Sequence, residues 1–181
     1  DIYKIKSSFK QIKKIDILVN SAGINISKTF LNLKDRDWKE IYNTNIFGIS
    51  NVIKYALPVL KKSSKQTKII NIASVKGTYS AVGHVAYASS KAALINLTTG
   101  LAKELSPNII VNSVSPGFVN TDMTKKTYSN RIQKQIKSIL LRRIAKTDEI
   151  ANVVLFLCSD KCTYITGQNI IVDGGFGIKN E

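Results

Sequence analysis

The sequence contains little of several residue types that would mark particular protein classes: among 181 residues there are two cysteines, one histidine, one methionine and three prolines. Two cysteines are too few for a disulfide framework in a chain of this size, so we expect a reducing compartment. No apolar run approaches the roughly 20 residues that cross a bilayer, and we predict no membrane partner. A hydrophobic content of 44% with 22% charged residues excludes a disordered or collagen-like chain.

Acidic residues are also scarce, with 12 Asp and Glu against 27 Lys and Arg, which gives a net charge of +15. Such a charge permits binding to nucleic acid or to an acidic partner. However, 23 Lys, 26 Ile and 15 Asn together make up 64 of the 181 residues. Because this bias runs through the whole chain, we interpret the lysines as solvated surface residues and predict no nucleic-acid partner.

Short apolar runs alternate with amphipathic stretches along the chain. Four runs have the length and composition of strands buried on both faces; they span residues 16–20, 68–73, 109–114 and 169–173. Helical spacing of apolar residues predicts helices over residues 1–14, 35–57, 85–105 and 147–158. We expect Asp35 to cap the second helix, and Pro58 together with the stretch from Lys61 to Lys68 to end it. Residues 118–145 form a lysine-rich excursion that we expect to be partly helical.

This alternation predicts an α/β fold with a doubly wound parallel sheet of the Rossmann type, in a single domain over residues 1–181. In such sheets, ligands bind beyond the carboxyl ends of the strands, where the strand order reverses. We therefore expect the chemistry in the loops that follow strands, at residues 20–25, 74–84 and 115–125.

A tyrosine and a lysine lie four residues apart in the long helix predicted over 85–105, so Tyr87 and Lys91 share one helix face. A phenol has an ordinary pKa of about 10, and a nearby ammonium lowers this pKa by favouring the phenolate. Such a pair can act as general acid and base. The spacing alone is as typical of a surface pair. Ser74, however, ends a strand thirteen residues before Tyr87, where its hydroxyl can bind a carbonyl that the phenol protonates.

These residues belong to a longer set of motifs. In chain order the set comprises Asn20-Ser-Ala-Gly23, Asn45, Ser74, Tyr87-x-x-x-Lys91, Pro116-Gly117 and Val172-Asp-Gly-Gly175. In this order and spacing it resembles the short-chain dehydrogenase/reductase family over nearly the whole chain. Within that family, Pro116-Gly-Phe-Val-Asn-Thr-Asp-Met123, Asp148-Glu-Ile-Ala-Asn152 and Tyr164-Ile-Thr-Gly167 are most similar to the 3-oxoacyl-(acyl-carrier-protein) reductases. Related carbonyl and hydroxysteroid reductases share much of this pattern.

The resemblance implies four catalytic residues. Tyr87 protonates the carbonyl oxygen as hydride arrives from a nicotinamide, while Lys91 lowers the pKa of Tyr87 and binds the nicotinamide ribose. Ser74 orients the carbonyl, and Asn45 holds a water that continues the proton relay to Lys91. The hydride chemistry itself belongs to the cofactor.

The resemblance also implies the residues that bind this cofactor. The adenosine side is lined by Asn20, Ala22 and Gly23, and the nicotinamide side by Tyr87, Lys91, Pro116, Gly117, Val119 and Thr121. Ser21 stands where the family often has a second Asn. NADP(H) is favoured over NAD(H) only by analogy with the acyl reductases, because the residue that distinguishes the two would lie on a strand that this chain lacks.

The chain begins at Asp1, its only methionine is Met123, and nothing in it matches the Gly-rich turn with which the family binds the cofactor pyrophosphate. By resemblance, about seventy residues with three strands would be missing from its front. Residues 16–20 would then form an exposed apolar edge that invites aggregation. We therefore expect an incomplete or processed chain that binds dinucleotide weakly or not at all.

The implied function is NAD(P)H-dependent reduction of a ketone to a secondary alcohol, with 3-oxoacyl thioesters of fatty acid synthesis as the leading substrates. The alternatives are a reductase or dehydrogenase of steroids, sugars or small carbonyls and, from another class, a non-catalytic basic binding protein. The resemblance implies a homotetramer for the complete protein, with helices near 45–57 and 85–105 at its interface. We expect it in the cytoplasm, or in the mitochondrial or plastid matrix of a eukaryote.

Four lysines gather before the strand at 68–73: Lys61, Lys62, Lys65 and Lys68. We interpret them as a solvated turn. Docking of an acidic acyl carrier protein is the functional alternative, because Lys65 falls near a basic docking position of the resembled reductases, although Ser106-Pro-Asn108 replaces a second such position.

The remaining reactive side chains indicate no separate site. His84 lies three residues before Tyr87, and we interpret it as a loop residue near the mouth of the active site rather than as a catalytic base. Cys158 and Cys162 lie at a helix end without a nearby histidine, so we predict reduced structural thiols and no metal site.

Overall fold

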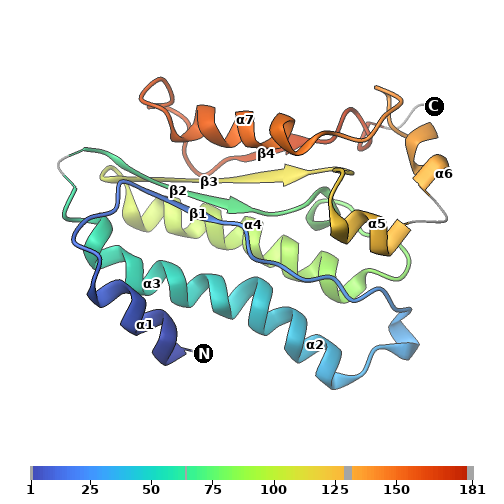
Figure 1. Ribbon diagram of the computed structural model, residues 1–181, viewed down its shortest axis with the longest axis horizontal. Coiled ribbons are helices and arrows are strands. Elements are labelled where there is room, and N and C mark those ends of the chain that lie inside the picture. The colour runs from blue at the N-terminus through green and yellow to red at the C-terminus, as the bar shows by residue number, and fades with distance from the viewer. Residues whose placement is uncertain (1, 64, 129–131, 179–181) are drawn as a thin grey trace.

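The computed structural model describes residues 2–63, 65–128 and 132–178. A parallel sheet of four strands forms its centre (Figure 1): β1 (Ile17–Asn20), β2 (Thr67–Ile72), β3 (Ile109–Pro116) and β4 (Asn169–Val172). The predicted α/β class with a parallel sheet is confirmed. The four described strands lie side by side in the order in which they follow along the chain, so this sheet contains no point at which the strand order reverses. The loops expected to bind a ligand are therefore identified by the carboxyl ends of the strands alone.

The strands differ in burial according to their place in the sheet. β2 and β3 are central and buried along almost their whole length, which explains why their sequences are apolar without alternation. β1 and β4 lie at the two edges and are partly exposed.

The first half of the chain covers one face of the sheet. Its helices are α1 (Ile2–Lys10), α2 (Asp35–Tyr42), α3 (Ile49–Leu60) and α4 (Val85–Leu105), and α2 continues into α3 through the π-helical segment η2 (Asn43–Gly48) (Figure 1). A hydrophobic core fills the space between these helices and the sheet. It includes Ile53 and Leu94 from the helices and Ile69 and Val111 from the strands.

The second half covers the opposite face with α7 (Thr147–Cys158), whose Ile150 and Leu157 pack against Ile70 and Val114. The expected excursion at 118–145 contains the helices α5 (Asp122–Tyr128) and α6 (Ile132–Lys137); its residues 129–131 lie outside the described residues. Two short 3-10 turns, η1 (Phe30–Asn32) and η3 (Val75–Gly77), lie in loops.

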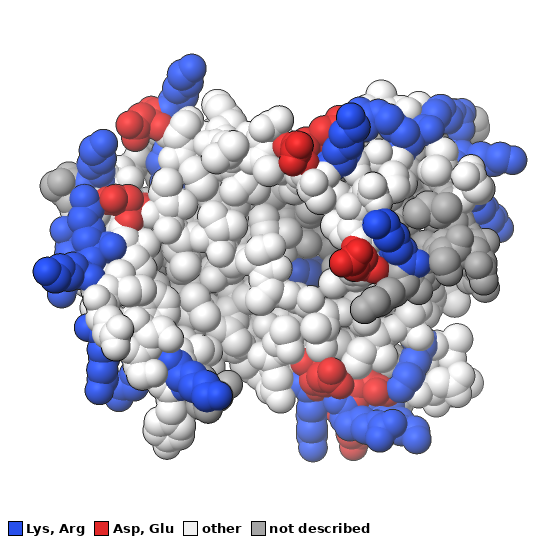
Figure 2. Space-filling model, viewed as in Figure 1, with Lys and Arg blue, Asp and Glu red and all other residues white. Residues whose placement is uncertain are grey.

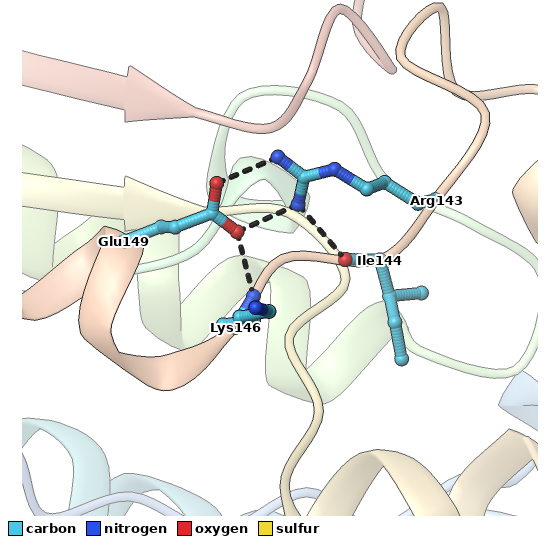
Figure 3. A network of polar contacts seen from close by, with 4 residues as sticks. All are labelled: Arg143, Ile144, Lys146 and Glu149. Carbon is cyan, nitrogen blue, oxygen red and sulfur yellow. Dashed lines mark hydrogen bonds and ion pairs between the residues drawn. The ribbon is translucent and has the colours of Figure 1, made fainter.

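Polar contacts at the start of α7 hold it to the end of this excursion. Arg143 donates two hydrogen bonds to the carboxylate of Glu149, at 2.6 and 2.7 Å, and the backbone N–H of Lys146 donates a third at 2.8 Å (Figure 3). The Arg143 bonds, followed by the backbone bond, lower the pKa of Glu149 to about 2. The carboxylate therefore binds the backbone N–H of the N-cap residue Lys146 as well as pairing with Arg143.

Two predicted features of the second helix are wrong. Pro58 lies inside α3, which ends at Leu60, because Val59 and Leu60 are buried and their packing offsets one lost backbone hydrogen bond near the helix end. Asp35 is the first residue of α2 rather than its cap; Lys34 holds the cap position, and its backbone N–H donates to Asp37 at 2.9 Å.

Basic side chains gather around the periphery of the face seen in Figure 2, while its hollowed middle is largely uncharged. In the part of the chain that the structure describes, no helix is both long and apolar enough to span a bilayer.

Candidate active site

Ser74 and Tyr87 meet at the carboxyl end of β2. Ser74 follows the strand with an extended backbone, and its hydroxyl oxygen accepts a hydrogen bond from the N–H of Lys76 at 3.2 Å. The Ser74 side chain also acts on the phenol of Tyr87, which lies in the first turn of α4, and lowers the pKa of that phenol. Because the backbone bond occupies an acceptor position of Ser74, its hydroxyl proton is free to point at the phenolic oxygen.

Lys91 lies one turn further along α4, as the sequence spacing predicts. Tyr87 is 9% and Lys91 4% exposed, and the Lys91 ammonium donates to the carbonyl of Ile72 at 2.8 Å. The ammonium lies 5.8 Å from the centre of the Tyr87 ring. Burial lowers the pKa of Lys91 to about 8. Burial also raises the pKa of Tyr87, and the Ser74 hydrogen bond acts in the opposite direction.

Asn45 lies in the π-helical segment η2 and is fully buried. Its amide oxygen accepts from the N–H of Ile24 at 2.9 Å, and its amide nitrogen donates to the Ile24 carbonyl and to Ser90, both at 3.0 Å. These bonds join the loop after β1 to α4. The Asn45 amide oxygen accepts one bond and has a second acceptor position. The contact of Asn45 with a water therefore stays a prediction.

Gly23 brings this loop close to Lys91. A Cβ added to Gly23 would lie 3.2 Å from the Lys91 ammonium nitrogen and 3.5 Å from the Asn45 amide oxygen. A side chain here would therefore cover the groups that the resemblance assigns to the cofactor ribose and the proton relay. The absence of a side chain at residue 23 keeps both groups accessible, which fits a bound dinucleotide.

Asn20 is buried within the sheet rather than directed at an open cleft. Its amide donates to Asn71 at 2.8 Å, Asn71 donates to Thr98 at 2.9 Å, and Thr98 donates to the Leu94 carbonyl at 2.8 Å. The chain of bonds fixes the carboxyl ends of β1 and β2 on α4. Sequence reasoning missed Asn71 and Thr98, although a polar residue within an apolar strand run signals such a buried partner.

Two cavities flank the segment that follows β3. The smaller, about 80 Å³, is lined by Asn25, Ser74, Val75, Lys76, Tyr87, Gly117, Phe118, Met123, Thr124 and Phe176. The larger, about 490 Å³, is mostly apolar and is lined by Val19, Ser21, Ile72, Pro116, Val119, Thr121, Thr147, Ile150, Ala151, Val154 and Leu155. We call them the substrate pocket and the cofactor cavity.

The two cavities divide the residues that the resemblance implied for the nicotinamide side. Pro116, Val119 and Thr121 line the cofactor cavity, whereas Gly117 lines the substrate pocket beside Ser74 and Tyr87. A Cβ at Gly117 would lie 2.8 Å from the Cα of Asp173, so only glycine fits between the two loops. Ala22 is exposed and lines neither cavity. The residues present thus fit a nicotinamide dinucleotide across this segment.

The apolar wall of the substrate pocket was not foreseen from the sequence. Phe118 and Phe176 meet edge to face with ring centres 5.1 Å apart, and Met123 lies on the same pocket. Phe176 comes from the end of the chain, two residues after Gly174, and no local pattern links it to Phe118. The signal available in the sequence was that Phe176 directly follows the Gly174-Gly175 motif.

The other reactive side chains considered in the sequence are one histidine and two cysteines. His84 is buried at the start of α4, with Nδ1 3.3 Å from the Asn25 side-chain oxygen, and burial followed by the charge of Lys76 lowers its pKa to about 4. Cys158 and Cys162 are free thiols. Over the described ranges, no group of three or more His, Cys, Asp or Glu side chains could hold a metal ion.

Known proteins share this arrangement over most of the chain. Residues 4–177 match a family model described as Enoyl-(Acyl carrier protein) reductase. The chain is 45% identical to the 3-oxoacyl-[acyl-carrier-protein] reductase FabG of Aquifex aeolicus, with 94% of this chain and 71% of the relative covered. It is 42% identical to the protein of the same name from Thermotoga maritima, with 91% and 67% covered.

A solved structure is similar over the same extent. The crystal structure of a short-chain dehydrogenase/reductase from Brucella melitensis, named as a glucose/ribitol dehydrogenase, superposes with a TM-score of 0.92 at 33% identity, with 97% of this chain and 72% of that chain covered.

Proposed function

The chain belongs to the short-chain dehydrogenase/reductase family of NAD(P)-dependent oxidoreductases, and from this premise we propose that it reduces the ketone of 3-oxoacyl thioesters in fatty acid synthesis to a secondary alcohol. The observation that carries the proposal is that Ser74 and Tyr87 line the same small, largely apolar pocket, with Lys91 one turn further along α4. The names of the relatives from Aquifex and Thermotoga support the choice of substrate.

Ser74 and Tyr87 bind the carbonyl oxygen in this proposal. The Ser74 hydroxyl donates a hydrogen bond to that oxygen, and the Tyr87 phenol donates a second bond along which its proton is transferred. A nicotinamide held beside Pro116, Val119 and Thr121 would supply the hydride for the carbonyl carbon. The carbon gains the hydride and the oxygen gains the proton, so the ketone becomes an alcohol and Tyr87 becomes a phenolate.

The phenolate of Tyr87 must then regain a proton. Lys91 stabilises it through its positive charge, and a pKa of about 8 makes the ammonium a ready proton donor near neutral pH. We propose that Asn45 holds the water that resupplies Lys91, since the Asn45 amide oxygen and the Lys91 ammonium lie on the same side of Gly23.

For the cofactor, we propose NADP(H) in preference to NAD(H), held by residues 1–181 as part of one dinucleotide-binding domain. Pro116, Val119 and Thr121 would hold the nicotinamide side, with Gly117 at the boundary to the substrate pocket. We also propose that the adenosine side is held by Asn20, Ala22 and Gly23. Asn20 acts by fixing the loop through its hydrogen bond to Asn71. Weak dinucleotide binding by these 181 residues stays a prediction, which a low-micromolar dissociation constant in an NADPH fluorescence titration would contradict.

For partners, we propose an acyl thioester, with acyl carrier protein docking at Lys61, Lys62 and Lys65. Lys68 cannot join these three lysines in docking, because its ammonium is buried and donates to the carbonyls of Ser159 and Cys162. By family resemblance, we predict that the complete protein is a homotetramer in which α3 and α4 form the interface. We also predict that it is located in the cytoplasm or in the matrix of an organelle.

The docking proposal is tested by reversing charge at Lys61, Lys62 and Lys65. The KM for a carrier-linked substrate should rise several-fold while the KM for a soluble acetoacetyl thioester stays unchanged, since only the carrier presents an acidic surface. Equal changes for both substrates would show that the lysines act through the fold.

The proposed reaction is tested by NADPH oxidation with an acetoacetyl thioester. Tyr87→Phe keeps the ring but removes the proton donor, so kcat/KM should fall at least about 1,000-fold. Tyr164→Phe, a change of the same kind at a fully exposed side chain that lines neither cavity, serves as the matched control and should keep full activity. Retained turnover in Tyr87→Phe would overturn the assignment.

The name of the Brucella protein, a glucose/ribitol dehydrogenase, raises a sugar as an alternative substrate. The substrate pocket has a wall of Val75, Phe118, Met123 and Phe176 and encloses about 80 Å³. An apolar wall leaves the hydroxyl groups of a sugar without partners, so a short acyl chain fits it better.

A further inference from the structure

The end of β4 leads into a loop that forms part of the substrate pocket. Asp173 follows the strand directly, and Phe176 lines the pocket together with Ser74 and Tyr87. Neither Asp173 nor Phe176 is used in the proton transfer or in the cofactor binding proposed above. What Phe176 contributes is part of the apolar wall, and the contacts of its loop decide how firmly this part is held.

The Asp173 side chain fixes the backbone on both sides of Phe176. Its Oδ1 accepts a hydrogen bond from the N–H of Gly175 at 2.9 Å, and its Oδ2 accepts one from the N–H of Gly177 at 2.8 Å. The N–H of Phe176 itself donates to the backbone carbonyl of Asp173 at 3.2 Å. Hydrogen bonds to a carboxylate are among the stronger ones in proteins. Three successive backbone N–H groups thus bind one residue, which leaves the loop little freedom to shift Phe176.

The loop after β2 holds this arrangement from outside. Tyr79 donates its phenolic hydrogen to Oδ2 of Asp173 at 3.4 Å. Burial, followed by the charge and the hydrogen bond of Asp173, raises the pKa of Tyr79, so the phenol stays protonated and remains a donor. A Cβ added to Gly177 would overlap the phenolic oxygen of Tyr79, so the two loops are in close contact at this point.

The ring of Phe176 is supported as well as its backbone. Its partner in the edge-to-face contact, Phe118, is only 8% exposed and has little room to move in a packed interior. Met123, which lines the same pocket, is 42% exposed and unbranched, so it can adapt to a ligand. The two rings are therefore the fixed part of the wall. Phe176 is the less buried of the two, so its replacement opens the pocket without removing a core residue.

We propose that Phe176 limits the length of the acyl chain that the substrate pocket accepts, so that the protein prefers short 3-oxoacyl groups. The inference rests on the proposed ketone reduction for the placement of the ketone on Ser74 and Tyr87. The acyl chain extends from the ketone along the apolar wall, and the pocket encloses about 80 Å³, which leaves room for a few carbons. A longer chain has to displace Phe176 against the hydrogen bonds that Asp173 accepts.

The experiment compares the binding of two thioesters of N-acetylcysteamine, the four-carbon acetoacetyl and the eight-carbon 3-oxooctanoyl compound, by calorimetry. The wild-type chain should bind the four-carbon ligand at least about tenfold more tightly, although the longer ligand has the larger apolar surface. Phe176→Ala should bind the eight-carbon ligand at least about tenfold more tightly than the wild-type chain does, because the space of the ring becomes available to the longer chain. Phe176→Leu should lie between the two.

The matched control is Phe30→Ala, the same change at a side chain that is 65% exposed in η1 and lines neither cavity. It should keep the preference of the wild-type chain. The same change of preference in Phe30→Ala and in Phe176→Ala would show that the effect does not arise in the pocket, and would overturn the inference.

Three further results would overturn it: no binding of the four-carbon ligand by the wild-type chain, equal or tighter binding of the eight-carbon ligand, or an unchanged preference in Phe176→Ala. The wild-type comparison decides even if Phe176→Ala does not fold. Failure of the proposed function is seen separately, as absent oxidation of NADPH with an acetoacetyl thioester, because the binding preference requires no turnover.

Discussion

At the scale of single residues, the buried lysine proposed for the proton relay, Lys91, lowers the stability of the fold. Its ammonium is buried and bonded to the Ile72 carbonyl, and burial lowers its pKa from 10.5 to about 8. The charged form is thus less stable in the folded chain than in the unfolded chain. At pH 7, where Lys91 is charged in both states, this difference opposes folding by about 3 kcal/mol.

Lys91→Met should therefore raise the melting temperature at pH 7 while lowering kcat/KM at least about 100-fold. The gain should shrink as the pH rises from about 8 to about 10.5, because the wild-type lysine loses its charge in the folded state first. Thermal melts of both proteins across this range measure the effect. A variant that melts at or below the wild-type temperature at pH 7 contradicts the argument.

At the scale of elements, the junction between the excursion at 118–145 and α7 depends on one carboxylate. Glu149 accepts bonds from Arg143 and from the backbone N–H of Lys146, the residue before its own helix (Figure 3). The excursion carries Phe118 and Met123 of the substrate pocket, and the backbone of Ala145 pairs with that of Phe118. The Glu149 bonds therefore anchor the far end of the segment that forms one wall of the pocket.

Glu149→Gln should lower the melting temperature at pH 7 by a few degrees, because the amide cannot form the charged pair with Arg143. The pKa of Glu149 is lowered from 4.5 to about 2, so its contribution is complete above about pH 4.5 and is lost as the pH falls toward 2. Melts of variant and wild type should converge over this interval. Asp148→Asn removes a charge from the same turn and leaves the pair intact; an equal effect of this control would refute the role of the pair.

At the scale of the whole molecule, β1 is an edge strand whose apolar residues face solvent. Ile17 is 45% and Val19 42% exposed, and β1 pairs only with β2 in the sheet that the described residues form. An apolar strand with open hydrogen-bonding groups is a template for pairing with other chains. The edge exposure expected from the sequence is confirmed for the described residues.

Ile17→Lys should slow concentration-dependent aggregation several-fold, since a charge on the edge strand opposes pairing between chains. Light scattering during incubation at several protein concentrations measures the rate. Leu31→Lys introduces the same charge at a side chain that is 93% exposed in η1, away from the sheet edge. If both variants slow aggregation equally, net charge rather than the edge is responsible.

The sequence by itself determined the order of the elements and the common helix face of Tyr87 and Lys91. Apolar runs without alternation indicate parallel strands covered on both faces, and β2 and β3 are such strands. The i, i+4 spacing of Tyr87 and Lys91 puts both on one face of α4 because helix geometry is local. Both conclusions depend only on the periodicity of neighbouring residues.

The tertiary structure alone decided which distant residues share a site. The bonds of Asn45 to Ile24 and Ser90, the contact of Phe118 with Phe176, and the division of residues 116–121 between two cavities join segments far apart in the chain. Pro58 remained helical because the packing of Val59 and Leu60 outweighs a local preference. Local sequence patterns report backbone periodicity, whereas these contacts depend on how the whole chain packs.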